Sequence, residues 1–226
     1  MPNYVKNLLY LKGEKAEIEK LLEYIRGNEQ EEMFDFNKVI PLPEELDIES
    51  SSILKNSFIV YSYVKHHACS GEFHKMIEAN RRKNETPDSC LERLQKTGRI
   101  SMALGRTAYK NKRKYGYIDW YYWCIDNWGT KWNAMDVLLD EDNTLCFDTA
   151  WSAPRPVIKK LAELFPAVSI VHKWSDEDVG NNTGHIEFEN GKISFINLPA
   201  DGSPEAYDLY EECWDTDLEP EYREEN

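Results

Sequence analysis

The sequence lacks the short motifs that mark several large classes of protein. It contains no C-x-x-C pair, no G-x-S-x-G nucleophile motif and no glycine-rich phosphate-binding loop. Its five cysteines are scattered and odd in number, which indicates reduced thiols rather than disulfides or an iron–sulfur site. No apolar run approaches the roughly 20 residues that span a bilayer, and the N-terminus lacks a basic segment followed by a cleavage site. We therefore expect a cytoplasmic protein with no cofactor and no membrane partner.

What the sequence does contain is sufficient for a sizeable core. Of 226 residues, 41% are hydrophobic and 12% aromatic, which argues against disorder despite a net charge of −14. The charge is uneven: Arg81–Lys114 holds eleven Lys/Arg and three Asp/Glu, whereas the 26 residues from Asp201 hold eleven acids and one arginine. The simple interpretation is a solvated helical face and a solubilising tail. The alternative is a basic segment that binds something acidic, either the protein's own tail or nucleic acid.

Apolar spacing predicts the order of the secondary structure. Two strands are expected to follow the first strand and helix, and a second helix and a fourth strand come next. This βαββαβ order is that of the ferredoxin-like arrangement, extended here by an Asn190-Gly191 hairpin and a helix capped by Ser203. We therefore predict an α+β fold: a ferredoxin-like antiparallel sheet with an extra C-terminal hairpin and helix. The expected elements are strands over 4–11, 132–139, 144–151 and 167–174, and helices over 13–27 and 152–165.

The middle of the chain is predicted to be a large, mainly helical insertion. Residues 72–114 have helical spacing, whereas 53–64 fit a helix or a strand equally well. The helix expected to end at Gly129 is apolar on nearly all of its sides, which indicates that it is buried. The expected domains are a core of 1–26 and 132–214, an insertion of 27–131 packed on the core, and an acidic tail of 215–226.

Several long motifs carry a resemblance to one family. They are the MPN start, FDFNKVIPLP at 34–43, NWGTKWNAMD at 127–136, FDTAWSAPRPVIKKL at 147–161 and SDEDVGNNTGHIEFENGKI at 175–193. With these motifs the sequence resembles the YubB-type ferredoxin-like proteins carried by bacteriophages, plasmids and bacterial genomes. The resemblance spans nearly the whole chain, although the basic segment lies outside the motifs. It implies a ferredoxin-like topology without a cluster, a mobile-element setting and no particular activity.

The segment NWGTKW is the first candidate site. Its tryptophans would form the walls of a small pocket, its lysine would supply a cation, and its asparagine and threonine would supply hydrogen bonds. Because the second strand begins where the third ends, Trp132 and Trp151 are expected to be neighbours. The alternative is that the tryptophans only anchor the insertion to the sheet, each worth roughly 3–5 kcal/mol on truncation to alanine. The candidate pocket residues are Asn127, Trp128, Thr130, Lys131, Trp132 and Trp151.

The acidic loop SDEDVGNN is a second candidate, because carboxylate and amide oxygens suit a hard cation such as Mg²⁺ or Ca²⁺. Its spacing does not match a calcium loop, so the favoured interpretation is that its side chains shape a turn. We expect the loop at the end of the sheet opposite NWGTKW, beside the acidic turn at 140–142. The candidate residues are Asp176, Glu177, Asp178 and Asn181.

A third cluster, HHACSGEFH, offers zinc ligands at His66, His67, Cys69 and His74, but a second pair with regular spacing is lacking. We therefore predict no metal site.

No complete catalytic set is present, so the leading hypothesis is a non-enzymatic accessory protein that binds another macromolecule. The favoured partner is a protein. One alternative is a nucleic-acid-handling protein that uses Arg81–Lys114, with Tyr109, Tyr115 and Tyr117 stacking on bases; the net charge opposes this. The other is a small-molecule or cation-dependent enzyme with a pocket near Trp128.

Overall fold

The computed structural model describes residues 3–28 and 33–219 and divides into two units. The core unit consists of Met1–Pro41 and Cys124–Asn226, and the helical unit consists of Leu42–Trp123. The chain therefore leaves the core unit once and returns to it once, as it does around an insertion.

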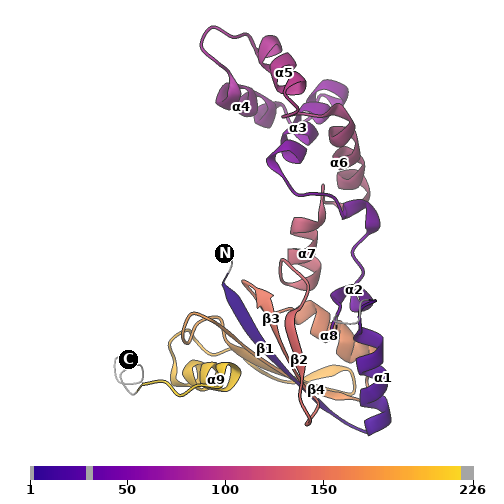
Figure 1. Ribbon diagram of the computed structural model, residues 1–226, viewed down its shortest axis with the longest axis vertical. Helices are drawn as coiled ribbons and strands as arrows, with labels where there is room; N and C mark the ends of the chain where they lie inside the picture. The colour runs from indigo at the N-terminus through magenta and orange to yellow at the C-terminus, as the bar shows by residue number, and fades with distance from the viewer. Residues whose placement is uncertain (1–2, 29–32, 220–226) are drawn as a thin grey trace. The chain divides into compact units, whose positions relative to one another are not determined.

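Among the described residues of the core unit, six strands form one antiparallel sheet. They are β1 (Tyr4–Lys12), β2 (Met135–Leu139), β3 (Thr144–Ala150), β4 (Ser169–Asp176), β5 (Gly184–Glu189) and β6 (Lys192–Asn197). Their order is β2-β3-β1-β4-β5-β6, so β1 lies between β3 and β4 (Figure 1). Every second side chain of β1 is buried, from Val5 to Leu11, as expected for a strand, and this buried face includes the polar Asn7.

Helices cover both faces of this sheet. They are α1 (Lys15–Ile25), α2 (Phe36–Val39), α8 (Arg155–Leu164) and α9 (Pro204–Trp214), with α7 (Trp120–Trp128) ending in the core unit. α8 packs over β4, β5 and β6, whereas α9 packs on the other face of β1 and β4 (Figure 1). There Glu212 of α9 accepts a hydrogen bond from the Tyr10 hydroxyl at 2.9 Å and pairs with Lys173 at 2.6 Å.

An aromatic cluster joins the segment after α1 to the sheet. Phe34 and Phe36 are fully buried and meet Phe147 of β3 edge to face, with ring centroids 5.2 and 6.3 Å away. Phe36 also meets Trp128 at 5.7 Å. These contacts explain why the core unit extends to residue 41, beyond residue 26 where the sequence analysis ended its first segment.

The helical unit has a hydrophobic core of its own. After the short helix η1 (Glu44–Leu46) it consists of α3 (Ser52–His66), α4 (Ser70–Asn80), α5 (Pro87–Lys96) and α6 (Met102–Tyr115). The ambiguous segment 53–64 is helical, and the Ser51 side chain caps it by accepting from Leu54 N–H. The buried residues that these helices share are Ile59, Val60, Phe73, Met76, Ile77, Cys90, Leu94 and Ile100.

α3 and α6 approach closely at a glycine. A Cβ on Gly105 would lie 2.2 Å from the carbonyl oxygen of Ser57 and 2.7 Å from the Cβ of Tyr61. The Ser57 hydroxyl also accepts from Ser101 N–H at 2.9 Å, which fixes the start of α6 against the middle of α3.

The α+β class, the βαββαβ order and the C-terminal hairpin and helix are confirmed, and Asn190 and Gly191 form the hairpin turn. One detail was wrong: the third strand was expected to run over 144–151 and so to include Trp151. β3 ends at Ala150, and Trp151 has a φ of 68° and is 44% exposed. The strand ends because the chain turns here towards α8.

Within the two described stretches, none of the helices combines the length and apolarity needed to cross a bilayer. The acidic tail predicted over 215–226 is described as far as Glu219, and its remainder lies outside the described residues.

Replacing Gly105 with alanine should destabilise the helical unit, because the added methyl group must push α6 away from the Ser57 carbonyl. We expect a loss of about 1–3 kcal/mol in the free energy of unfolding, measured by urea denaturation. The matched control is Gly71→Ala in α4, where nothing lies within 4 Å of the added methyl group and stability should rise by up to about 1 kcal/mol. Equal stability of the two variants would contradict the close approach.

Candidate functional site

The NWGTKW segment begins where α7 stops and lies against the start of α8. Gly129 ends α7 with a φ of 83°, a left-handed conformation that favours glycine. A Cβ at this position would lie 2.7 Å from Cδ of Pro156 and 3.1 Å from the carbonyl oxygen of Ala153. Glycine is therefore required twice here, by its backbone angle and by the close approach of α8.

Two of the six candidate pocket residues are held inside the core unit. Trp128 is 4% exposed, and its Nε1 donates to the carbonyl oxygen of Ile40 at 2.7 Å. Thr130 is 1% exposed, and its hydroxyl donates to the carbonyl oxygen of Ala150 at 2.8 Å. Asn127 is half-buried in the last turn of α7. Trp128 and Thr130 therefore present no wall or hydrogen-bonding group to solvent.

Three other candidates do come together. The Lys131 ammonium lies 4.1 Å from the ring centroid of Trp132 and 4.9 Å from that of Trp151, both within the range of a cation–π interaction. Trp132 and Trp151 are thus neighbours of the same lysine, at the end of the sheet where β2 begins and β3 finishes.

The acidic loop lies at this same end, so the prediction that it would lie at the opposite end was wrong. β3 and β4 are both antiparallel to β1 and therefore parallel to each other: Tyr4 pairs with Ala150, and Val5 pairs with Asp176. The Asn182 amide joins the two strand ends by donating to the Trp151 carbonyl oxygen at 3.1 Å. The acidic turn at 140–142 lies at the other end, next to Thr144.

The carboxylate of Asp176 shapes this loop. It is buried, and its Oδ1 accepts from the Asn3 amide at 3.1 Å and from Asp178 N–H at 3.0 Å. Glu177 N–H donates to the Tyr4 carbonyl oxygen, and the Asn181 amide donates to that of Val179. These hydrogen bonds stabilise the turn and occupy the loop's polar groups. Among the residues that the structure describes, no group of three or more His, Cys, Asp or Glu side chains is arranged to hold a metal ion.

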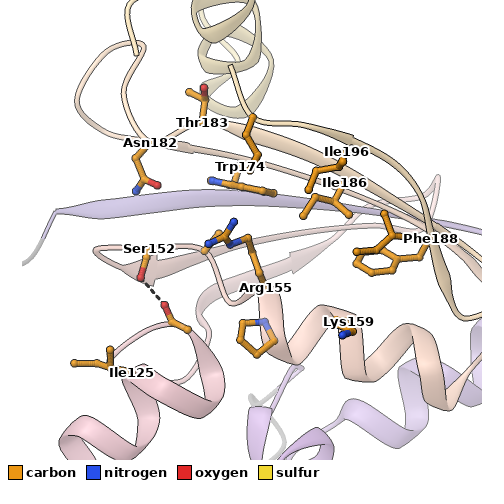
Figure 2. Close-up of a pocket in the computed structure, with 15 residues that line it drawn as sticks. Ile125, Ser152, Arg155, Lys159, Trp174, Asn182, Thr183, Ile186, Phe188 and Ile196 are labelled. Carbon is orange, nitrogen blue, oxygen red and sulfur yellow. Dashed lines mark hydrogen bonds between the residues drawn. The ribbon is translucent and has the colours of Figure 1, made fainter. Parts of the chain in front are cut away.

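A groove with a volume of about 840 Å³ opens beside these residues, in the core unit (Figure 2). It runs between the start of α8 and the outer strands β4, β5 and β6. Most of its lining is apolar, and the part contributed by β6 and the segment after it is half exposed: Ile193 by 50%, Ile196 by 53% and Leu198 by 48%. The other apolar side chains in the lining include Ile125, Trp174, Ile186 and Phe188.

The charged side chains of the groove are all of one sign. Arg155 and Lys159 of α8 line it, whereas none of its described lining residues is Asp or Glu. The Arg155 guanidinium lies 5.9 Å from the Trp174 ring centroid, and Figure 2 shows it between that ring and Ser152. In a chain with 41 acidic residues, the described lining of this groove thus holds two cations and no carboxylate.

A series of buried hydrogen bonds connects β3, β1 and β4 next to Trp174. The Asn7 amide nitrogen donates to the Thr149 hydroxyl at 2.9 Å, so its Oδ1 is left to accept from His172 Nε2 at 3.0 Å. His172 therefore carries a proton on Nε2. Its Nδ1 is buried without a hydrogen-bond partner among the described residues, so a second proton there would be unfavourable and the ring is neutral. Burial, with smaller contributions from the charges of Arg155 and His185, lowers the pKa of His172 to about 3.

The groove was not predicted from the sequence, although one signal was present. In the second strand of the hairpin, Phe195 and Ile196 are consecutive and Ile193 and Leu198 flank them. Apolar and polar residues therefore do not alternate in this last strand, and both of its faces are apolar. Arg155 and Lys159 gave no signal, because one cation per helical turn is ordinary on an exposed helix face.

A match to a family model supports the fold class. Residues 127–217 match the family model described as the ferredoxin-like domain in Api92-like protein, a range that runs from the end of α7 to beyond α9. The chain also aligns with the crystal structure of protein Api92 from Yersinia pseudotuberculosis, at 9% identity and a TM-score of 0.44, covering 90% of this chain and 100% of that one. No curated protein matches the sequence.

Lowering the pH from 6.5 to about 5 should destabilise the protein, because His172 is neutral when folded and takes up a proton when unfolded. With a pKa of about 3 in the folded state against 6.5 otherwise, the unfolded state binds more protons throughout this window. The free energy of unfolding should then fall by about 1–2 kcal/mol, as measured by urea denaturation at each pH.

Two variants test the assignment to this histidine. His172→Gln keeps a donor for Asn7 and should flatten the pH dependence, with a remainder from His185, whose pKa burial also lowers. His66→Gln, at an exposed position of α3, is the control and should keep the wild-type slope. An unchanged slope in His172→Gln would count against the neutral buried histidine.

Proposed function

We propose that this protein is a non-enzymatic accessory protein that binds a partner protein, holding an extended apolar segment of that partner in the groove beside α8 and β6. The observation that carries the proposal is the row of half-exposed apolar side chains, Ile193, Ile196 and Leu198, along one side of an open groove. Apolar surface of this kind gains most when a partner covers it.

The position of β6 supports a peptide segment as the occupant. β6 pairs with β5 and is the last strand in the described sheet, so its outer edge faces no further strand there. An extended segment can add to such an edge through its main chain while every second side chain enters a neighbouring groove. The described β5–β6 pairing is irregular between Glu187 and Phe188, which brings both Ile193 and Ile196 to the groove lining.

Charge narrows the chemistry of the partner. Arg155 and Lys159 have no ion pair among the described residues and lie on the α8 side of the groove. A segment that carries acidic residues beside its apolar ones would meet these cations, whereas a basic segment would meet no carboxylate in the lining. The partner segment is therefore apolar with acidic flanking residues.

The setting forms part of this proposal. Its support is the resemblance of the long motifs, among them FDFNKVIPLP and NWGTKWNAMD, to proteins carried by phages, plasmids and bacterial genomes. An accessory role in the bacterial cytoplasm fits that setting. The alternative of an enzyme with a pocket near Trp128 has lost its main support, because Trp128 and Thr130 are buried and bonded to backbone carbonyl groups.

Selection from a displayed library of random peptides against the full chain tests the proposal. Peptides with apolar residues and flanking acids should be enriched and should bind with dissociation constants in the micromolar range, about −8 kcal/mol. Ile196→Asp places a charge in the groove and should weaken binding at least about tenfold. The matched control is Leu138→Asp on β2, the opposite edge of the sheet, where Leu138 is 68% exposed and binding should not change.

Two outcomes would contradict the proposal. One is that no peptide is enriched, or that both variants lose binding equally. The other is a concentration-dependent dimer, seen by sedimentation, that Ile196→Asp dissociates and Leu138→Asp does not; it would assign the groove to self-association instead.

A further inference from the structure

α6 of the helical unit has an unusual charge composition. Its 14 residues contain five Lys/Arg and no Asp or Glu. An exposed helix of ordinary composition intersperses acids with its cations, since pairs of opposite charge three or four residues apart stabilise it. Only two of the five cations have described polar partners: Lys114 pairs with Glu45 at 2.7 Å, and Lys112 donates to the Gly116 carbonyl oxygen at 2.6 Å.

The other three cations form a single stripe. Arg106, Lys110 and Arg113 are spaced by four and three residues, so they lie on one face of the helix. All three are exposed, and none of them forms an ion pair within the described chain. The opposite face of α6 is the buried one: Gly105, Ala108 and Asn111 are its buried residues.

Packing holds this stripe in place. Gly105 lies against α3, and the Asn111 amide donates to the carbonyl oxygen of Glu45 at 2.6 Å. Two other arginines of the unit are paired with acids: Arg93 makes a two-pronged contact with Glu85 at 2.7 and 2.8 Å, and Arg81 pairs with Glu78 at 2.9 Å. The stripe has a rigid support and no internal counter-charge.

We propose that this stripe, Arg106, Lys110 and Arg113, binds the phosphate backbone of a double-stranded nucleic acid. Seven residues of α-helix rise about 10.5 Å, and phosphates of one strand follow each other every 3.4 Å or so along a duplex axis. The stripe therefore spans about three phosphates of one strand. Contacts of this kind carry affinity without reading the base sequence.

The aromatic side chains favour a duplex over a single strand. Single strands are held largely by bases stacking on exposed aromatic rings. Tyr109 already stacks on His66, with ring centroids 4.0 Å apart and an angle of 3° between the planes, and the Tyr115 hydroxyl donates to Glu45 at 2.7 Å. These two rings are engaged within the helical unit, whereas the three cations of the stripe are exposed.

The net charge of the chain does not oppose this contact at short range. The helical unit, 42–123, holds 14 Lys/Arg and 10 Asp/Glu, a balance of +4, so the excess of acids lies in the remainder of the chain. Repulsion from distant exposed charges is screened beyond about 8–10 Å at physiological ionic strength. It slows the encounter more than it weakens the bound state.

Binding of fluorescently labelled duplexes of about 20 base pairs, one of DNA and one of RNA, to the full chain tests the proposal by anisotropy between about 50 and 200 mM salt. The variant Arg106→Ala/Lys110→Ala/Arg113→Ala should bind at least about tenfold more weakly at the lower salt, and its slope of log affinity against log salt should be smaller by about 2–3. The ratio of the two duplex affinities then shows which nucleic acid is preferred.

The matched control is Lys75→Ala/Lys83→Ala/Lys96→Ala, which removes the same charge from exposed positions of the helical unit outside α6. It should keep the wild-type affinity within about twofold and the wild-type slope. The proposal is overturned if the control loses as much as the stripe variant, if the wild-type chain binds neither duplex at the lower salt, or if a single strand of the same length binds more tightly than either duplex. Circular dichroism melting of both variants ensures that they are compared in the folded state.

Discussion

The pairing of β1 with two antiparallel neighbours determines what the rest of the core unit can bring together. Because β3 and β4 flank the same strand, they run parallel to each other and finish at the same end of the sheet. Trp151, the Asp176 loop and the start of α8 therefore converge there. The buried chain from Thr149 through Asn7 to His172 crosses the three strands. It makes their alignment specific, since any shift in register would leave buried polar groups without partners.

Each of the two units has one surface that differs in chemistry from the other. The groove of the core unit is apolar with a few cations, and its lining comes from strands and a helix that are distant in sequence. The stripe on α6 is purely cationic and comes from a single helix. Neither surface contains any of the six candidate pocket residues that the sequence singled out, because those residues mostly serve the packing of α7 and the sheet end. They are Asn127, Trp128, Thr130, Lys131, Trp132 and Trp151.

Much of the fold follows from local patterns that the sequence displays openly. The apolar run over β1, the Asn190-Gly191 turn and the Ser203 cap all predicted the observed elements, because each depends on neighbouring residues. The position of the Asp176 loop was predicted wrongly, because it depends on the relative directions of several strands and not on neighbouring residues. The groove depends on β6 lying beside β5 and α8, a tertiary arrangement that Ile193 and Ile196 alone do not reveal.

The hydrogen bond from Trp128 to the Ile40 carbonyl oxygen closes the core unit at the two points where the chain departs for the helical unit and comes back. Because the core unit holds those two points together, it fixes the two ends of any segment inserted between them. The entropic cost of closing such a segment rises only slowly with its length. The core unit is thus a platform that can carry intervening helices of different length or kind, and a surface such as the α6 stripe can lie on them without disturbing the sheet.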